Sequence, residues 1–187
     1  MPDRLPPIPL DAMTVEQREA AVVFKASRGA ELFGPFVALV RSPELLTRVS
    51  AIGEYLRYRS ALSRRLTEFA IIVTAAHWNE QYEWDLHSRL ALKSGVALAT
   101  IDAIAAGRRP EGMPDDEAIL YTLCTEIHRD HIVSDDTCTR AVRTFGEQGL
   151  VDAVGICGYY AMLAMVLTMA SGPQPGGAKA QLRIPTR

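Results

Sequence analysis

Residues 64–78 read RRLTEFAIIVTAAHW, and residues 79–87, which follow directly, read NEQYEWDLH. The first stretch is apolar nearly all round, which is typical of a buried helix. A buried β-strand is the alternative, but the length of the run and its alanine content favour a helix. Ser63 stands in position to cap this helix, and a second helix is expected to begin near Asn79. Because the connection is so short, the two helices should pack antiparallel.

Helix signals recur along the rest of the chain, whereas strand signals are nearly absent. Capping residues, apolar residues at helical spacing and terminating glycines define the expected helices. These are residues 15–27, 43–56, 64–78, 79–94, 96–106, 115–129, 135–146 and 147–170, and residues 35–40 form a short apolar turn. We therefore predict an all-α helical bundle of roughly eight helices in one domain, residues 13–170. An extended proline-rich arm, residues 1–12, precedes this domain, and a C-terminal tail, residues 171–187, follows it.

The composition is that of a globular protein, with 48% hydrophobic and 22% charged residues among 187. A formal net charge of -2 gives no reason to expect a nucleic acid or an anionic membrane as partner. Residues 153–170 are uncharged and just reach the length of a membrane span, but glycine and alanine dilute their hydropathy. Gly155, Gly158 and Ala161 are expected instead to let helices approach closely.

The three cysteines, Cys124, Cys138 and Cys157, form no CxxC pair, and their number is odd. A disulfide framework is therefore not expected, and a reducing compartment such as the cytoplasm fits best. The cysteines fall on three predicted helices without a resolving partner. We identify no histidine near any of them in sequence. We therefore expect them to be dispensable for activity.

Glu68 is the only acidic residue on the apolar helix 64–78. A carboxylate on a buried helix must be paired, or its pKa must rise until it is neutral. Either state is useful in catalysis. The structural alternative is an ion pair with an arginine such as Arg57 or Arg64.

Four residues of the next helix, Glu80, Glu83, Trp84 and His87, follow at i, i+3, i+4 and i+7 and should share one face. Glu83 and His87 can hydrogen-bond, which would orient the ring and favour the imidazolium ion. The alternative is an exposed helix pair of little energetic value. Nearby aromatic side chains argue against full exposure and suggest the wall of a small-molecule pocket: His77, Trp78, Tyr82 and Trp84.

Metal binding is the competing interpretation of this segment, because its histidines and glutamates could supply mixed nitrogen and oxygen ligands. A di-iron bundle, however, uses Glu-x-x-His on two helices, and here Glu83-x-x-x-His87 occurs once. His128 and His131 offer only His-x-x-His near a helix end. We therefore expect no metal.

Glu68, followed twelve, fifteen and nineteen residues later by Glu80, Glu83 and His87, has the layout of the alkylhydroperoxidase D and carboxymuconolactone decarboxylase superfamily. Other stretches also resemble carboxymuconolactone decarboxylase-like proteins: Ser42-Pro43-Glu44-Leu45, residues 53–58, Tyr82-Glu83-Trp84, Lys93-Ser94-Gly95 and residues 155–160. The resemblance covers about residues 30–170. It implies an all-helical alkylhydroperoxidase D-like fold and assembly as a homotrimer or homohexamer.

The peroxidase branch of this superfamily carries a CxxC pair, with a preceding glutamate and a following histidine as proton relay. Glu68 and His87 match the relay, but the two cysteine positions correspond to Glu80 and Glu83. Without two thiols there, no disulfide cycle can run, so peroxidase function by that route is rejected. The sequence resembles the decarboxylase branch more closely.

The resemblance implies a cofactor-free lyase or isomerase acting on a small carboxylated lactone or a related intermediate of aromatic degradation. His87 would stabilise an oxyanion or deliver a proton, Glu83 would orient it, and Glu68 would donate or relay protons. Glu68 and His87 should therefore face each other in one pocket. The residues assigned to substrate binding are Arg57, Tyr58, Arg64, His77, Trp78, Glu80, Tyr82 and Trp84. A non-catalytic small-molecule binding protein on the same scaffold is the alternative.

Overall fold

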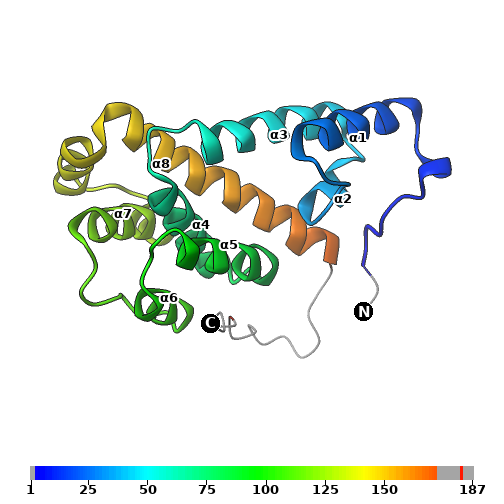
Figure 1. Ribbon diagram of the computed structural model, residues 1–187. Helices are drawn as coiled ribbons and strands as arrows, with labels where there is room; N and C mark the ends of the chain where they lie inside the picture. Colours follow the sequence, from blue (N-terminus) through cyan, green and yellow to red (C-terminus); the bar gives the residue numbers. More distant parts are fainter. Residues whose placement is uncertain (1–2, 172–181, 183–187) are drawn as a thin grey trace. The chain divides into compact units, whose positions relative to one another are not determined.

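The fold was analysed in a computed structural model that describes residues 3–171 and Leu182 (Figure 1). Within these residues, regular structure is entirely helical, which confirms the predicted all-α fold. The eight α-helices are α1 (Val15–Arg28), α2 (Pro35–Leu39), α3 (Pro43–Tyr58), α4 (Arg64–Trp78), α5 (Gln81–Lys93), α6 (Leu98–Ala105), α7 (Asp115–Thr125) and α8 (Asp135–Ser171). Two short turns add to them, the 3-10 turn η1 (Leu10–Ala12) and the π-helical turn η2 (Glu126–Asp130).

Most helix ends lie where capping residues predicted them. Thr14 forms a capping box with Gln17 at the start of α1, and Gly29, in the left-handed region with φ 67°, ends that helix. Ser63 accepts a hydrogen bond from the Leu66 amide at the start of α4, and Asn79, with φ 51°, ends α4. Local side-chain chemistry therefore sets the bounds of the central helix.

One helix differs from the sequence prediction: the helix expected over 115–129 is α-helical only to Thr125 and then widens into η2. The break expected at Gly146 is confirmed. The label α8 covers two helices that meet in a kink at Gly146, whose angles, φ 73° and ψ 169°, are non-helical and easily adopted by glycine.

The chain packs as two compact units, and the first contains residues 3–55 and 162–171. Its core includes an aromatic cluster of Phe24, Phe33 and Phe36, whose ring centroids lie 4.7–5.6 Å apart. The N-terminal arm is bound to this unit, because the amides of Arg4 and Leu5 donate to the carbonyl of Ala170. The predicted tail lies outside the described residues, apart from its first residue and Leu182.

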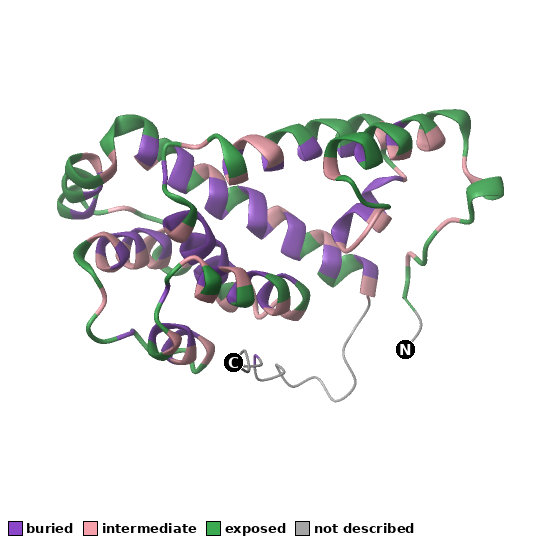
Figure 2. Ribbon diagram, viewed as in Figure 1, coloured by how far each residue is buried: buried purple, intermediate pink, exposed green. Residues whose placement is uncertain are grey.

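The second unit, residues 56–161, is built round α4. This helix packs against α5, α6, α7 and η2, and ten consecutive residues from Leu66 to Ala75 are buried (Figure 2). Burying a leucine, isoleucine or phenylalanine side chain contributes about 1.5–3 kcal/mol, so this all-round burial anchors the unit. The prediction of a buried central helix is confirmed.

Polar contacts fix the neighbours of α4 within the second unit. Arg65 at the start of α4 pairs with Asp116 and Glu117 of α7, and Asp152 of α8 accepts a hydrogen bond from the Ala61 amide at 2.8 Å. Gly155 allows a close approach, since an added Cβ would lie 3.2 Å from Leu56. Gly158 has no such neighbour within the chain, because it is exposed and has open space where a Cβ would stand.

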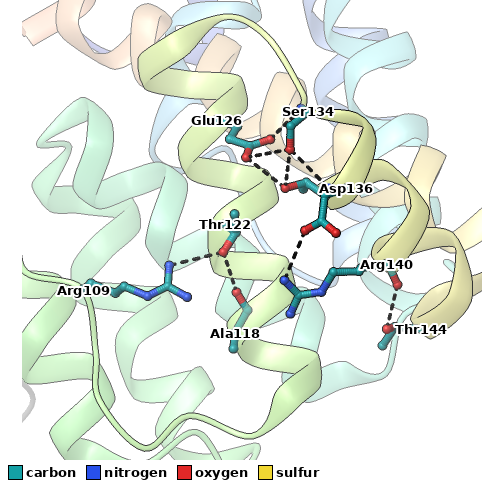
Figure 3. Close-up of polar contacts among 9 residues, drawn as sticks. Arg109, Ala118, Thr122, Glu126, Ser134, Asp136, Arg140 and Thr144 are labelled. Atoms are coloured by element: carbon teal, nitrogen blue, oxygen red, sulfur yellow. Dashed lines mark hydrogen bonds and ion pairs between the residues drawn. The ribbon is translucent and has the colours of Figure 1, made fainter.

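The start of α8 is capped by two side chains (Figure 3). Ser134 accepts a hydrogen bond from the Thr137 amide at 3.2 Å, as its position before two aspartates predicted. Glu126 of η2 accepts from the Ser134 amide at 2.9 Å and from the Thr137 hydroxyl at 2.9 Å. The π-helical turn is therefore tied to the first turn of α8.

Among the described residues, α8 is the one helix long and apolar enough to cross a membrane, by length and composition only. Half of its most apolar window is buried within the protein, and the buried residues include Ile156, Tyr160 and Leu163. A core helix passes the same test, so this property is weak support for a membrane span.

Candidate active site

Glu68 of α4 and His87 of α5 meet in the interior of the second unit. The two helices are joined only by Asn79 and Glu80, so α5 returns along α4. This brings His87 Nδ1 within 2.6 Å of Glu68 Oε2, a short hydrogen bond between buried groups. The geometry expected from the nineteen-residue spacing is therefore observed.

Glu83 lies one turn before His87 on α5 and engages the other ring nitrogen. Its Oε2 is 3.3 Å from His87 Nε2. Burial opposes protonation of the ring, but the hydrogen bonds to Glu68 and Glu83 outweigh it and raise the pKa of His87 above its ordinary value of 6.5. The two contacts therefore favour the imidazolium form of His87, which lies between the side chains of Glu68 and Glu83.

Two arginines approach the second carboxylate oxygen of Glu68. Arg64 Nη2 lies 2.9 Å and Arg57 Nη2 lies 3.9 Å from Glu68 Oε1. The exposed ring of Tyr58 stands beside both guanidinium groups, at 5.5 Å from Arg64 and 5.2 Å from Arg57. The structural role considered for Glu68, an ion pair with these arginines, thus occurs together with its hydrogen bond to His87.

The three side chains of this network, Glu68, Glu83 and His87, are almost completely shielded from solvent. Glu68 is 0%, His87 2% and Glu83 4% exposed. Arg64, which contacts Glu68, is itself exposed, and the exposed Tyr58 ring lies beside it. Glu68 Oε1 accepts no hydrogen bond among the described residues, which leaves a buried acceptor beside Arg64.

Tyr160 of α8 belongs to this environment and was not assigned to it from the sequence. Its buried ring stands edge-on to His87, with centroids 5.1 Å apart. Burial raises the pKa of Tyr160 well above its ordinary value of 10, so it remains a neutral phenol. The pair Tyr159-Tyr160 on an apolar helix was the available signal, since a buried hydroxyl group needs a polar surrounding.

The remaining predicted residues have different surroundings. Trp84 is completely buried and belongs to the core. Glu80 is the N-cap of α5, where its carboxylate accepts from the Glu83 amide at 2.7 Å, and burial raises the pKa of this carboxyl group. Trp78 is partly buried, and Tyr82 is 39% exposed. Trp84 thus contributes to the core, and its place in a pocket wall stays a prediction.

His77 lies at a second location, not with Glu68. Its ring stacks on His128 of η2, with centroids 4.9 Å apart. Both histidines line a pocket of about 230 Å³, together with Cys124, Tyr121 and residues of α4 and α6. Neither Glu68 nor His87 lines this pocket. Among the described residues, no three histidine, cysteine or acidic side chains form a cluster that could hold a metal ion.

The cysteines are not all isolated, as the sequence analysis had assumed. The sulfur atoms of Cys124 in α7 and Cys157 in α8 are 3.5 Å apart, and both residues are buried. The premise that no cysteine has a resolving partner is therefore wrong. The expectation of no nearby histidine is also wrong, because His128 follows Cys124 by four residues, one helical turn.

Residues 43–115 match the model of the carboxymuconolactone decarboxylase family. This segment of the chain is similar to that family. The match runs from the start of α3 to the start of α7 and includes Glu68, Glu83 and His87. It confirms the resemblance to that family, and Glu80 and Glu83 make this a branch without the CxxC pair.

The fold resembles a crystal structure from Ralstonia eutropha described as an alkylhydroperoxidase AhpD core, an uncharacterized peroxidase-related protein. The two chains share 15% identity, and the alignment covers 92% of this chain and 93% of the other with a TM-score of 0.71. At this identity the likeness establishes the fold alone, which is AhpD-like. No curated protein matches the sequence.

Proposed function

We propose that this protein is a cofactor-free decarboxylase or isomerase that acts on a small carboxylated lactone or a related intermediate of aromatic degradation. The buried imidazole of His87, which contacts a carboxyl group at each ring nitrogen, is the observation that carries the proposal. Such a group is a proton donor placed where water cannot compete. The family match over residues 43–115 supports the same reaction class.

Loss of CO2 leaves an electron pair on carbon, which a neighbouring lactone carbonyl delocalises as an enolate before a proton is added. His87 Nε2 is the nitrogen that can turn to substrate, because its 3.3 Å contact is weaker than the 2.6 Å contact of Nδ1. In this scheme, Glu68 positions the ring, while Nε2–H stabilises the enolate oxygen or protonates the carbon. When the product leaves, the contact between Glu83 and His87 Nε2 forms again.

Arg64 and Arg57 supply the positive charge that a carboxylated substrate needs. An arginine bound tightly to the departing carboxylate would stabilise the ground state and slow the reaction. We therefore propose that they hold a second carboxylate, one that the reaction retains. In this scheme the site opens by displacement of the exposed Arg64 side chain, which contacts Glu68, and of the Tyr58 ring beside it.

The test is release of CO2 from carboxylated muconolactones by the purified protein, followed with His87→Gln and Glu68→Gln. Each variant should keep the fold and lose turnover by about a hundredfold or more, since proton transfer contributes that much. His131→Asn is the matched control, because His131 is exposed and lies outside the network. Undiminished CO2 release by His87→Gln would refute the assignment.

The second candidate function is a non-catalytic small-molecule binding protein. It is favoured by the separation between the closed Glu68–His87 network and the pocket of about 230 Å³, which contains neither residue. Titration calorimetry that detects a lactone without any CO2 release would support binding alone. The cytoplasm is the proposed location for either function, since three cysteines without a disulfide framework suit a reducing compartment.

A further inference from the structure

Cys124 and Cys157 are placed to react with one another. Their sulfur atoms are 3.5 Å apart, in a buried contact between α7 and α8 within the second unit. A disulfide bond is about 2 Å long, so small side-chain rotations suffice to form one. The third cysteine, Cys138, is exposed and lies outside this pair.

The pair also has an environment that favours the reactive thiolate. Contacts with Cys124, His128 and Thr74 lower the pKa of Cys157 to about 5 against the opposing effect of burial. His128 is itself held in place, because its Nε2 lies 3.0 Å from the hydroxyl of Thr74. The two sulfurs therefore form a close pair with an imidazole ring beside them.

The pair adjoins a pocket through which a small molecule can arrive. Cys124 and His128 line the cavity of about 230 Å³, whose apolar wall includes Val73 and Ile104. His128 is carried by η2, and π-helical turns of this kind occur frequently at functional sites. A thiol, a histidine and a cavity thus converge at a place that the proposed decarboxylase chemistry does not use.

We propose that Cys124 and Cys157 form a reversible redox site, separate from Glu68 and His87, in which a small peroxide entering this pocket oxidises the two thiols to a disulfide. Cys124 lies on the pocket wall and passes its proton to the Cys157 thiolate. At the same time the Cys124 sulfur attacks the peroxide. A sulfur–oxygen bond forms and the oxygen–oxygen bond breaks. The products are a sulfenic acid on Cys124 and an alkoxide or hydroxide, which takes a proton from His128 or water.

The Cys157 sulfur then attacks the Cys124 sulfur, and the sulfenic oxygen leaves as water while the disulfide forms. Two thiols lose two electrons in total, and the peroxide is reduced to an alcohol, or to water, plus one water. An external dithiol restores the pair by thiol–disulfide exchange. The site is thus a modification site that records exposure to peroxide and does not depend on the chemistry proposed for α4 and α5.

The test uses the Cys138→Ser protein, in which Cys124 and Cys157 are the remaining cysteines. After exposure to hydrogen peroxide, both titratable thiols should disappear and peptide mapping should find a Cys124–Cys157 cross-link. Dithiothreitol should restore both thiols. Because both buried cysteines are intact in this variant, the result does not depend on a substitution in the core.

A second variant, Cys138→Ser with Cys157→Ala, shows whether the resolving thiol matters. Its Cys124 should form no internal cross-link and should react with peroxide more slowly than in Cys138→Ser, because the Cys157 thiolate that takes its proton is absent. Survival of both thiols in Cys138→Ser, under peroxide that fully oxidises Cys138 in the wild-type chain, would overturn the proposal. Cross-links between molecules without the internal one would overturn it equally.

Discussion

At the scale of single residues, the protonation of His87 is coupled to folding. Hydrogen bonds to Glu68 and Glu83 outweigh burial and raise its pKa above the ordinary 6.5 of an unfolded chain. The folded state therefore holds the proton more tightly, by about 1.4 kcal/mol for each pH unit of the shift. This stabilisation is complete below pH 6.5 and is lost as the pH rises through the pKa of the folded state.

We predict that the free energy of unfolding, measured with urea over a pH series, decreases as the pH rises above 6.5. In His87→Gln this part of the pH dependence should be absent, because glutamine does not titrate. His131→Asn serves as the control and should keep the wild-type profile, since His131 is exposed. Identical profiles for wild type and His87→Gln would show that the raised pKa does not contribute to stability.

The residues that sequence could and could not identify differ in how their contacts arise. Glu68 and His87 lie on neighbouring helices joined by two residues, so helical periodicity alone placed them at similar heights. Tyr160 and Cys157 come from α8, far along the chain, and reach His87 and Cys124 only through tertiary packing. No local pattern encodes such a contact. The Cys124–His128 spacing of one turn was readable and was overlooked.

At the scale of elements, the connection between α7 and α8 depends on Glu126. Its carboxylate accepts from the amide and hydroxyl of Ser134 and from the hydroxyl of Thr137 (Figure 3). The backbone hydrogen bond from Ser134 is the main cause that lowers the pKa of Glu126 below its ordinary 4.5. The side chain therefore acts as an additional cap for α8.

We predict that Glu126→Ala lowers the free energy of unfolding by about 1 kcal/mol, the usual cost of losing a helix cap. The loss should be present above pH 4.5 and should vanish as the pH falls through the pKa of the folded carboxyl group, since the protonated group no longer caps. Chemical denaturation at several pH values measures it. Glu111→Ala, at an exposed position in the loop before α7, should change little. Equal effects of both substitutions would contradict the capping role.

Helix ends were predictable where a side chain or glycine determines them, as at Thr14, Ser63 and Gly29. The π-helical turn at 126–130 was not, because a single widened turn is a response to packing and has no capping signature. At Gly146 the sequence correctly indicated the break between the two helices that α8 comprises.

At the scale of the whole molecule, apolar side chains remain uncovered on α8. Val151 is 68% and Val154 44% exposed, and Gly158, also exposed, follows one turn later. Residues at i, i+3 and i+7 share a helix face, so these three form one apolar strip within the second unit. A soluble monomer rarely leaves such a strip in water, and a second copy of the chain is the partner that would cover it.

We therefore predict a homo-oligomer, a trimer or hexamer, with this strip of α8 in its interface. Light scattering at micromolar concentration should give a mass that is a multiple of 20.5 kDa. Replacing Val151 and Val154 together by lysine should shift the protein toward the monomer, because two charges cannot be buried without partners. Ile132→Lys is the control, since Ile132 is 69% exposed in the loop before α8 and should leave the assembly intact. A wild-type mass of 20.5 kDa would contradict the prediction, and an oligomer unaffected by both lysines would place the interface elsewhere.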